Sequence, residues 1–221
     1  MSKKSWKKVA FVAILLVIVS VSTFILLSAQ NHSMQKTIRV ACVGDSLTQS
    51  SRYPYDLWLK LGKEAYFLEN FGVGGTTISL NTETPYMNTS AYQDALDFQP
   101  DIVIIMLGTN DAQINLKENN ATLTSDYVKL ISAFNELPSN PDIFVVLPPP
   151  IIDNQFMNLD PDYLTKIIIP SIQQAAEQTG LQTIDVYSAM LGHSDYYLDG
   201  VHVNDDGAEI IATEVFKAIK G

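Results

Sequence analysis

Ser46 is a candidate nucleophile because of where it falls in the sequence. It follows Gly44 and Asp45, directly after the apolar run 38–43. A glycine permits a sharp turn out of a strand, and Ser46 would then stand at the start of a helix. The N–H groups and positive dipole end of a helix N-terminus stabilise negative charge that develops beside the serine. A serine or aspartate here can also serve only as a helix cap, so Ser46 alone does not establish catalysis.

Asp199 and His202 stand three residues apart in segment 198–204. At this spacing a carboxylate can bond one imidazole nitrogen while the other nitrogen faces a serine hydroxyl. The chain contains 3 histidines, and His202 has the most suitable carboxylate partner among them. A surface turn with incidental charges is the alternative interpretation, because Asp and Gly are common turn residues.

Two further segments contain groups that could approach a ligand or stabilise an oxyanion. Glycines occupy all but one position of segment 72–75, so the backbone there can come close to a ligand. Asn110 would project a side-chain amide from the end of an apolar strand, where it could donate to an oxyanion. Each segment alone also fits an ordinary turn. The glycines lack the spacing of a dinucleotide-binding motif, and no P-loop lysine follows them.

The four segments together resemble the four sequence blocks of the GDSL or SGNH hydrolase superfamily, in the same order and spacing. They are Gly44-Asp45-Ser46-Leu47, the Gly75 loop, Gly108-Thr109-Asn110-Asp111 and Asp199-Gly200-Val201-His202. Four blocks in order are far more specific than any single short motif. The resemblance spans about residues 37–218. It implies the flavodoxin-like SGNH hydrolase fold, a three-layer α/β/α sandwich around a five-stranded parallel sheet.

The resemblance also implies roles for individual residues. Ser46 would be the nucleophile, His202 its general base and Asp199 the carboxylate that orients the histidine. The oxyanion hole would consist of the backbone N–H groups of Ser46 and Gly75 and the side-chain amide of Asn110. The implied reaction uses no metal and no cofactor.

Two positions depart from this pattern or leave a choice within it. Gly74 is an alternative to Gly75 as the second oxyanion donor, although the alignment of segment 70–75 with the family block favours Gly75. Val203 stands where many relatives have a proline after the histidine, which bears on the rigidity of that loop more than on the identity of the histidine.

The resemblance is closest to the bacterial branch that is similar to carbohydrate O-acetylesterases, including sialate O-acetylesterase-like proteins. It rests on segments 66–75, 100–111 and 147–150. It implies a serine ester hydrolase that removes short acyl groups, mainly acetyl, from carbohydrate esters through an acyl-serine. The alternatives are a lysophospholipase-like or thioesterase-like hydrolase of longer acyl esters, acyl transfer to a glycan, and a non-catalytic glycan-binding module at the cell surface.

The elements that must position these residues follow an alternating α/β pattern, in which short apolar runs alternate with longer amphipathic segments. Predicted strands cover residues 37–43, 65–70, 102–107, 143–147 and 183–186. Predicted helices cover residues 55–61, 92–98, 125–136, 162–179 and 206–220. Pro170 should kink or divide the fourth helix, and Ser125 or Thr124 could cap the third. We expect one domain, 37–221, with helices on both faces of a parallel sheet.

Composition restricts the class of protein and its partners. The chain has 221 residues, of which 47% are hydrophobic and 17% charged, as in an ordinary globular protein. Its net charge is -10, and all 24 acidic residues lie after residue 29. Such a field repels phosphates, so we expect no nucleic acid partner and favour a small-molecule or glycan ester as substrate. The single cysteine, Cys42, lies in an apolar run and is expected to be a buried hydrophobe.

The N-terminal residues have the pattern of a membrane segment. Residues 1–8 are basic, and residues 9–29 form an uncharged stretch of 21 residues, long enough as a helix to cross a bilayer core of about 30 Å. A poor cleavage site favours an uncleaved transmembrane anchor over a signal peptide. Basic residues hold the N-terminus in the cytoplasm, so the domain would be extracytoplasmic, or secreted if the segment is cleaved. Residues 30–36 read as a polar tether.

Overall fold

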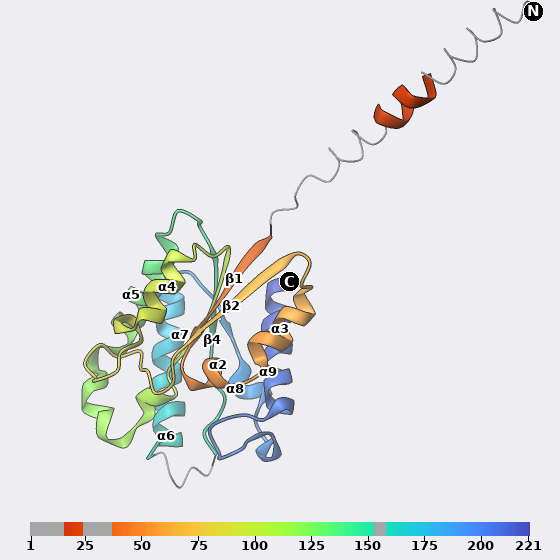
Figure 1. The fold of residues 1–221 in the computed structure, drawn as a ribbon. Helices are drawn as coiled ribbons and strands as arrows, with labels where there is room; N and C mark the ends of the chain where they lie inside the picture. The colour runs from red at the N-terminus through yellow and green to blue at the C-terminus, as the bar shows by residue number, and fades with distance from the viewer. Residues whose placement is uncertain (1–15, 24–36, 153–157) are drawn as a thin grey trace, which may run out of the picture. The chain divides into compact units, whose positions relative to one another are not determined.

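The computed structural model describes residues 16–23, 37–152 and 158–221. Internal contacts divide the chain into two units, Met1–Lys36 and Thr37–Gly221. In the first unit, residues 16–23 are helical (Figure 1). The rest of the predicted membrane segment, 9–15 and 24–29, lies outside the described residues. Among the residues that are described, we found no helix with both the length and the apolar character to cross a bilayer.

The second unit is built on a parallel sheet of five strands in the order β2-β1-β3-β4-β5. The strands are β1 (Ile38–Gly44), β2 (Tyr66–Gly72), β3 (Ile102–Met106), β4 (Asp142–Val146) and β5 (Thr183–Ile184). The central strands are apolar on both faces, since Val40 to Val43 of β1 and Val103 to Ile105 of β3 have no exposed surface. Strands buried on both faces require helices on both sides of the sheet.

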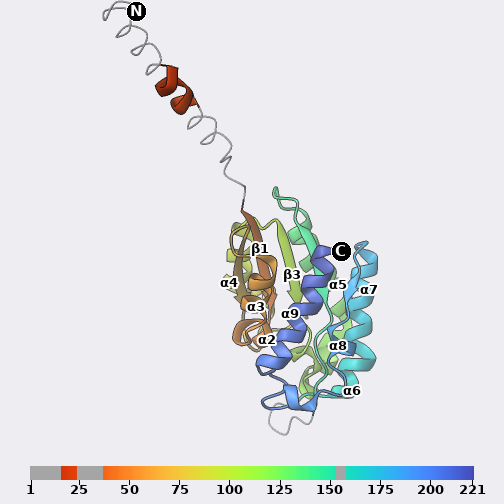
Figure 2. The same cartoon turned by 90° about the vertical axis from the view of Figure 1, so that its right-hand side faces the viewer.

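Helices cover both faces of this sheet, as Figures 1 and 2 show. One face carries α4 (Ser90–Asp97), α5 (Leu123–Asn135) and α7 (Ile169–Gln178), and the other carries α3 (Tyr53–Leu61) and α9 (Asp205–Lys220). The short helices are α2 (Ser46–Ser50), α6 (Pro161–Tyr163) and α8 (Val186–Ala189). The predicted α/β/α sandwich with a five-stranded parallel sheet is therefore confirmed.

The two cores follow the alternation of side chains along the strands. Val43, Val103 and Ile105 belong to the core under α4, α5 and α7. Cys42, Ile104 and Met106 belong to the core under α3 and α9. Cys42 is a free, fully buried thiol, as expected from its apolar surroundings. Burial raises the pKa of this thiol to about 12, so it stays protonated and unreactive.

The structure corrects several predicted boundaries. The helix expected from residue 125 begins at Leu123, and its N-cap is Thr122 without a side-chain cap bond, so Ser125 and Thr124 lie inside α5. The strand expected to end at residue 186 ends at Ile184, because Asp185 caps α8 and accepts from the Ser188 N–H. Pro170 does divide its segment, since a π-helix, Leu164–Ile168, joins α6 to α7.

Candidate active site

The end of β1 and the start of α2 hold Ser46 in place. Asp45 is the N-cap of α2, and its Oδ1 accepts from the Leu47 N–H at 2.9 Å. Gly44 has no room for a side chain, because a Cβ there would lie 2.0 Å from Thr48 Oγ1 and 2.6 Å from the Met106 carbonyl oxygen. The glycine lets β1 turn tightly into α2 against β3, so that Ser46 becomes the first residue of the helix.

His202 connects Ser46 to Asp199. His202 Nε2 lies 2.9 Å from Ser46 Oγ, and His202 Nδ1 lies 2.7 Å from Asp199 Oδ2. When the proton is on Nδ1, the Nδ1–H group donates a hydrogen bond to the carboxylate. The lone pair on Nε2 then accepts a hydrogen bond from the serine hydroxyl. The side chain of His202 is 28% exposed and Ser46 is half-buried, so a ligand can reach both. The structure thus brings together the three residues expected to form the catalytic triad.

The turn that carries Asp199 and His202 is held from several sides. Asp199 Oδ1 accepts from the backbone N–H groups of Val201 at 3.0 Å and His202 at 2.8 Å. Gly200 has φ +85°, a left-handed conformation that glycine adopts without strain. Val201 and Val203 are buried and anchor the turn to the two cores. Val203 therefore fixes the loop by packing into the core.

Ionisation of Asp199 is favoured by the same contacts. Partial burial raises the pKa of this carboxyl. Hydrogen bonds from the His202 side chain and from the backbone of His202 and Val201 together lower the pKa by more, so it lies below its usual value. Asp199 therefore remains a carboxylate, which fixes the orientation of the imidazole and stabilises its protonated form.

The parallel register explains why distant segments meet at Ser46. Gly44 at the end of β1 pairs with Gly72 of β2 on one side and with Met106 of β3 on the other. The loops that follow these strands therefore leave the sheet at the same level, at the edge where open α/β folds bind ligands. In Figure 1 this is the edge at α2. The glycine loop follows β2, and Asn110 follows β3.

Two of the three candidate oxyanion donors, Gly75 and Asn110, lie on these two loops. A Cβ at Gly74 would lie 3.6 Å from Ser46 Cβ, so the glycine loop passes close to the serine. Asn110 Nδ2 donates to the Thr76 carbonyl oxygen at 3.0 Å, which ties the asparagine to the same loop. An amide NH2 group has two hydrogens, so the second one remains for a ligand.

The contacts of the glycine loop favour Gly75 over Gly74 as a donor. The Gly74 N–H already donates to Gln49 Oε1 at 2.9 Å. Gly75 has φ +78° and is exposed, and its N–H has no acceptor within the described part of the chain. The same holds for the Ser46 N–H at the start of α2. These two N–H groups are therefore available to an incoming oxygen.

Sequence reasoning missed two residues that order the site. The Asp111 carboxylate is fully buried and accepts from the N–H groups of Ile78 and Ser79, each at 2.9 Å. These bonds hold the segment that follows Gly75 against the loop that carries Asn110. Gln49 orients Gly74 in the same way. Both contacts bridge segments far apart in the sequence, and local patterns gave no signal of them.

Asp45 is the second buried carboxylate beside the site. It has no exposed surface, and burial raises the pKa of its carboxyl to about 7, although the Leu47 N–H bond and the charge of His202 act in the opposite direction. Burial likewise raises the pKa of Asp111 to about 7, and the nearby Asp45 adds to this effect. Simultaneous ionisation of Asp45 and Asp111 is therefore unfavourable.

Comparisons with known proteins match most of the second unit. The sequence profile of the GDSL-like lipase/acylhydrolase family matches residues 42–210. An acetylxylan esterase from Xylanibacter ruminicola is 34% identical over a match that covers 84% of this chain and 44% of that protein. The chain thus spans less than half the length of this curated relative.

Solved structures show the same fold at lower identity. A carbohydrate acetylesterase from Sinorhizobium meliloti is 20% identical with a TM-score of 0.66, and the match covers 83% of this chain and 99% of that one. A lipase/acylhydrolase from Enterococcus faecalis is 22% identical with a TM-score of 0.66, and the match covers 84% of this chain and 96% of that one.

Proposed function

Because this chain belongs to the GDSL-like lipase/acylhydrolase family of carboxylic ester hydrolases, we propose that it removes acetyl groups from carbohydrate esters. The observation that carries the proposal is the hydrogen-bonded row of Ser46, His202 and Asp199 at the carboxyl edge of the sheet. The 34% identity to an acetylxylan esterase supports a short acyl group and a sugar ester.

Ser46 attacks the ester carbonyl in the first step. Its hydroxyl is too weakly acidic to react alone, so His202 Nε2 takes the proton as the Oγ–carbon bond forms. Asp199 stabilises the imidazolium that results. When the tetrahedral intermediate collapses, the carbon–oxygen bond to the sugar breaks, and His202 returns the proton to the departing sugar oxygen. The products of this step are the free sugar hydroxyl and an acetyl-serine.

Water completes the cycle by attacking the acetyl-serine. His202 accepts a proton from the water and later donates it to Ser46 Oγ, so acetate leaves and the free serine returns. In both steps the carbonyl oxygen becomes negatively charged. The N–H groups of Ser46 and Gly75 and the Asn110 amide donate to that oxygen, and each such donor contributes roughly 3–4 kcal/mol to lowering the barrier.

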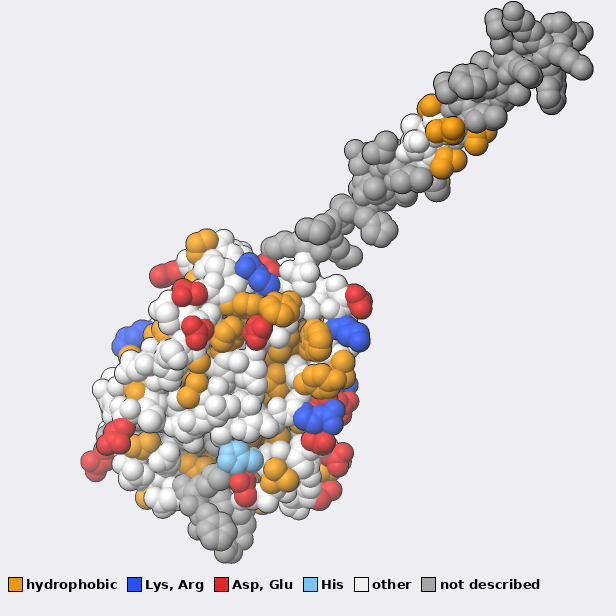
Figure 3. Space-filling view, viewed as in Figure 1, with side chains coloured by type: hydrophobic (Ala, Val, Ile, Leu, Met, Phe, Trp, Pro, Cys, Tyr) orange, Lys and Arg blue, Asp and Glu red, His pale blue; other side chains and the backbone are white. Residues whose placement is uncertain are grey.

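The distribution of charge supports a neutral substrate. Figure 3 shows acidic side chains around much of the visible face of the domain, with few basic ones between them. An excess of negative charge repels phosphate-bearing substrates and leaves uncharged sugar esters unaffected. It therefore favours glycan esters over lysophospholipids within this family.

Hydrolysis of p-nitrophenyl esters from acetate to palmitate tests the proposed acyl specificity. The purified full-length chain should prefer the acetate, with a rate that falls steeply as the acyl chain lengthens, and should release acetate from acetylated xylan. A preference for long chains would replace the proposal with a lipid-directed hydrolase. If folded protein cleaves no ester, a glycan-binding module or a dedicated acyltransferase becomes the better description.

We further propose that the enzyme works outside the cytoplasm, either anchored by residues 9–29 or secreted after cleavage. The basis is the uncharged stretch of 21 residues that follows the basic residues 1–8. Fractionation of expressing cells combined with external protease digestion tests the location. The domain should be digested from outside in intact cells, whereas protection from the protease until the cells are lysed would contradict it.

A further inference from the structure

A polar cleft lies between two segments of the chain, one that follows the glycine loop and one that follows Asn110 in the sequence. Its volume is about 550 Å³, within the range of roughly 300–1,000 Å³ typical of small-ligand sites. The residues that line it include Thr82, Glu83, Thr84, Gln113, Asn115 and Leu116. One wall is formed by residues 82–84, which come after the glycine loop, and the other by residues 113–116, which come after Asn110.

Each wall of the polar cleft is one hydrogen bond away from an oxyanion residue. Thr84 Oγ1 donates to the Gly75 carbonyl oxygen at 2.9 Å. The Gln113 N–H donates to the Asn110 carbonyl oxygen at 3.2 Å. Both walls of the cleft are therefore linked directly to the residues proposed to surround the carbonyl that Ser46 attacks.

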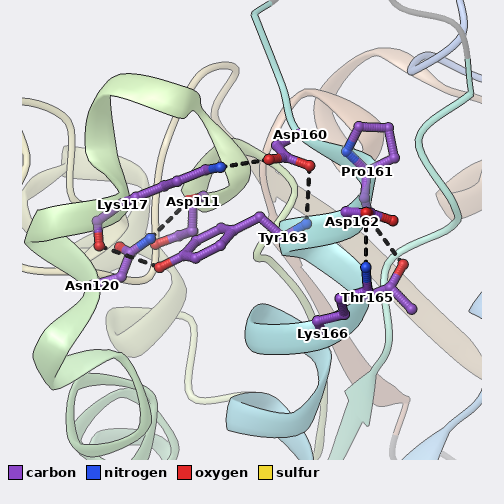
Figure 4. A network of polar contacts seen from close by, with 9 residues as sticks. All are labelled: Asp111, Lys117, Asn120, Asp160, Pro161, Asp162, Tyr163, Thr165 and Lys166. Atoms are coloured by element: carbon purple, nitrogen blue, oxygen red, sulfur yellow. Dashed lines mark hydrogen bonds and ion pairs between the residues drawn. The ribbon is translucent and has the colours of Figure 1, made fainter.

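The residues that follow the second wall in the sequence belong to a network of polar contacts, which is shown in Figure 4. Lys117 forms an ion pair with Asp160, and its ammonium lies 5.0 Å from the centroid of the Tyr163 ring. Tyr163 Oη donates to the Lys117 carbonyl oxygen at 3.2 Å. Gln113 itself pairs with Leu159 in an antiparallel bridge. The wall is thus formed before a ligand binds, which lowers the entropy cost of binding.

The chemistry of the polar cleft fits the hydroxyl groups of a sugar. Glu83, Gln113 and Asn115 make no side-chain hydrogen bond or ion pair to another residue that the structure describes. Amides can donate to and accept from hydroxyls, and a carboxylate accepts from neighbouring hydroxyls on one ring. The three side chains therefore offer both kinds of partner to the same ligand.

The same side chains argue against the other ligands of this family. Leu116 is the one apolar side chain among the described residues of the cleft, so a long acyl chain would gain little from burial there. None of these described residues is basic, and Glu83 would repel a phosphate head group. The ammonium of Lys117, which follows the lining residue Leu116 but does not itself line the cleft, is paired with Asp160.

We propose that the polar cleft binds a sugar ring of the esterified glycan next to the ester, through Glu83, Gln113 and Asn115. This inference rests on the proposed function and names the part of the substrate that the site recognises. The cleft then sets specificity for acetylated sugars over simple acetate esters, because only the former have hydroxyls that reach it.

Kinetics on two substrates test the proposal in the full-length chain. The variants are Glu83→Ala, Gln113→Ala and the double variant, with Glu177→Ala, at an exposed position of α7, as the matched control. The ratio of kcat/KM for acetylated xylo-oligosaccharides to that for p-nitrophenyl acetate should fall roughly tenfold or more in each single variant, mainly through KM. The control should keep the wild-type ratio. An unchanged ratio, or an altered acyl-length preference in its place, overturns the proposal.

Calorimetry separates this proposal from the proposed function. Unacetylated xylo-oligosaccharides are titrated into the Ser46→Ala variant, and then into the same variant with Glu83→Ala and Gln113→Ala added. Binding that weakens tenfold or more in the latter supports the cleft even if the wild type hydrolyses no sugar ester. Equal binding by both, or no binding to Ser46→Ala, overturns it.

Discussion

The Asn110 side chain has the hydrogens for its structural bond and for its proposed role as an oxyanion donor. One amide hydrogen is bonded to the Thr76 carbonyl oxygen, which orients the side chain, and the other is left for the substrate. A donor held in place in this way costs no reorganisation when negative charge develops. We therefore expect Asn110 to stabilise the transition state more than the bound substrate.

Replacement of Asn110 by alanine tests this role. We expect Asn110→Ala to lower kcat for p-nitrophenyl acetate by about a hundredfold or more, with a small change in KM, because the lost bond forms mainly in the transition state. Thermal unfolding of the same preparation provides the control for folding. Turnover close to wild type in a folded variant would exclude Asn110 from the oxyanion hole.

The helices and strands differ in how well the sequence reports them. Each predicted strand and each longer predicted helix is present, because apolar runs and amphipathic periods arise from burial of whole elements. The short helix α8 and the 3-10 segment Ile114–Thr122 were not predicted. The first is too short, and the second too weakly amphipathic, to show a periodic pattern of apolar residues. One wall of the polar cleft comes from this 3-10 segment and the other from the bend at residues 82–84, so the cleft had no sequence signal.

The site residues were named from four short motifs, whereas the contacts that hold them in place were not. Ser46, Asp199 and His202 fall in blocks whose residue types suit the chemistry. Asp111 also falls in such a block, but its bonds to Ile78 and Ser79 join residues more than thirty positions apart. Long-range pairing of this kind depends on the fold and cannot be read from local composition.

Asn204, the N-cap of α9, stabilises this helix close to the catalytic histidine candidate in the sequence. Asn204 Oδ1 accepts from the N–H groups of Asp206 and Gly207, each at 3.1 Å, and the residue lies two positions after His202. We expect Asn204→Ala to lower the free energy of unfolding by about 0.5–2 kcal/mol, as measured by urea denaturation. Asn204→Ser retains a capping oxygen and should recover most of the loss. Equal destabilisation by both variants would show that the cap is not the cause.

The two buried carboxyl groups, Asp45 and Asp111, make the free energy of unfolding of the protein depend on pH. Burial raises the pKa of Asp45 and Asp111 to about 7, above the value of 3.8 that applies in the unfolded chain. At a pH between 3.8 and about 7, these two groups bind more protons in the native state than in the unfolded chain. The stability that they contribute is therefore full at low pH and is lost as the pH rises towards 7. Asp199, with a lowered pKa, loses its stabilising effect only in more acidic solution.

We therefore expect the thermal midpoint to be higher at about pH 5.5 than at about pH 8 at constant ionic strength. Differential scanning calorimetry across this range measures the effect. Asp45→Asn removes one of the two titrating groups while keeping an oxygen for the Leu47 N–H, so the pH dependence should become flatter in that variant. A midpoint that rises steadily from pH 5.5 to pH 8 would contradict the assigned pKa direction.

The measurement that tests the catalytic role of Ser46 most directly is covalent labelling of the full-length chain with a fluorophosphonate, followed by peptide mass spectrometry. The phosphorus is attacked by an activated serine with loss of fluoride, so we expect one label per chain at Ser46. Labelling should be absent in Ser46→Ala, strongly slowed in His202→Ala and unchanged in Ser188→Ala, which alters a serine of α8 outside the site. A label on another residue, or equal labelling of wild type and His202→Ala, would show that Ser46 is not a nucleophile activated by His202.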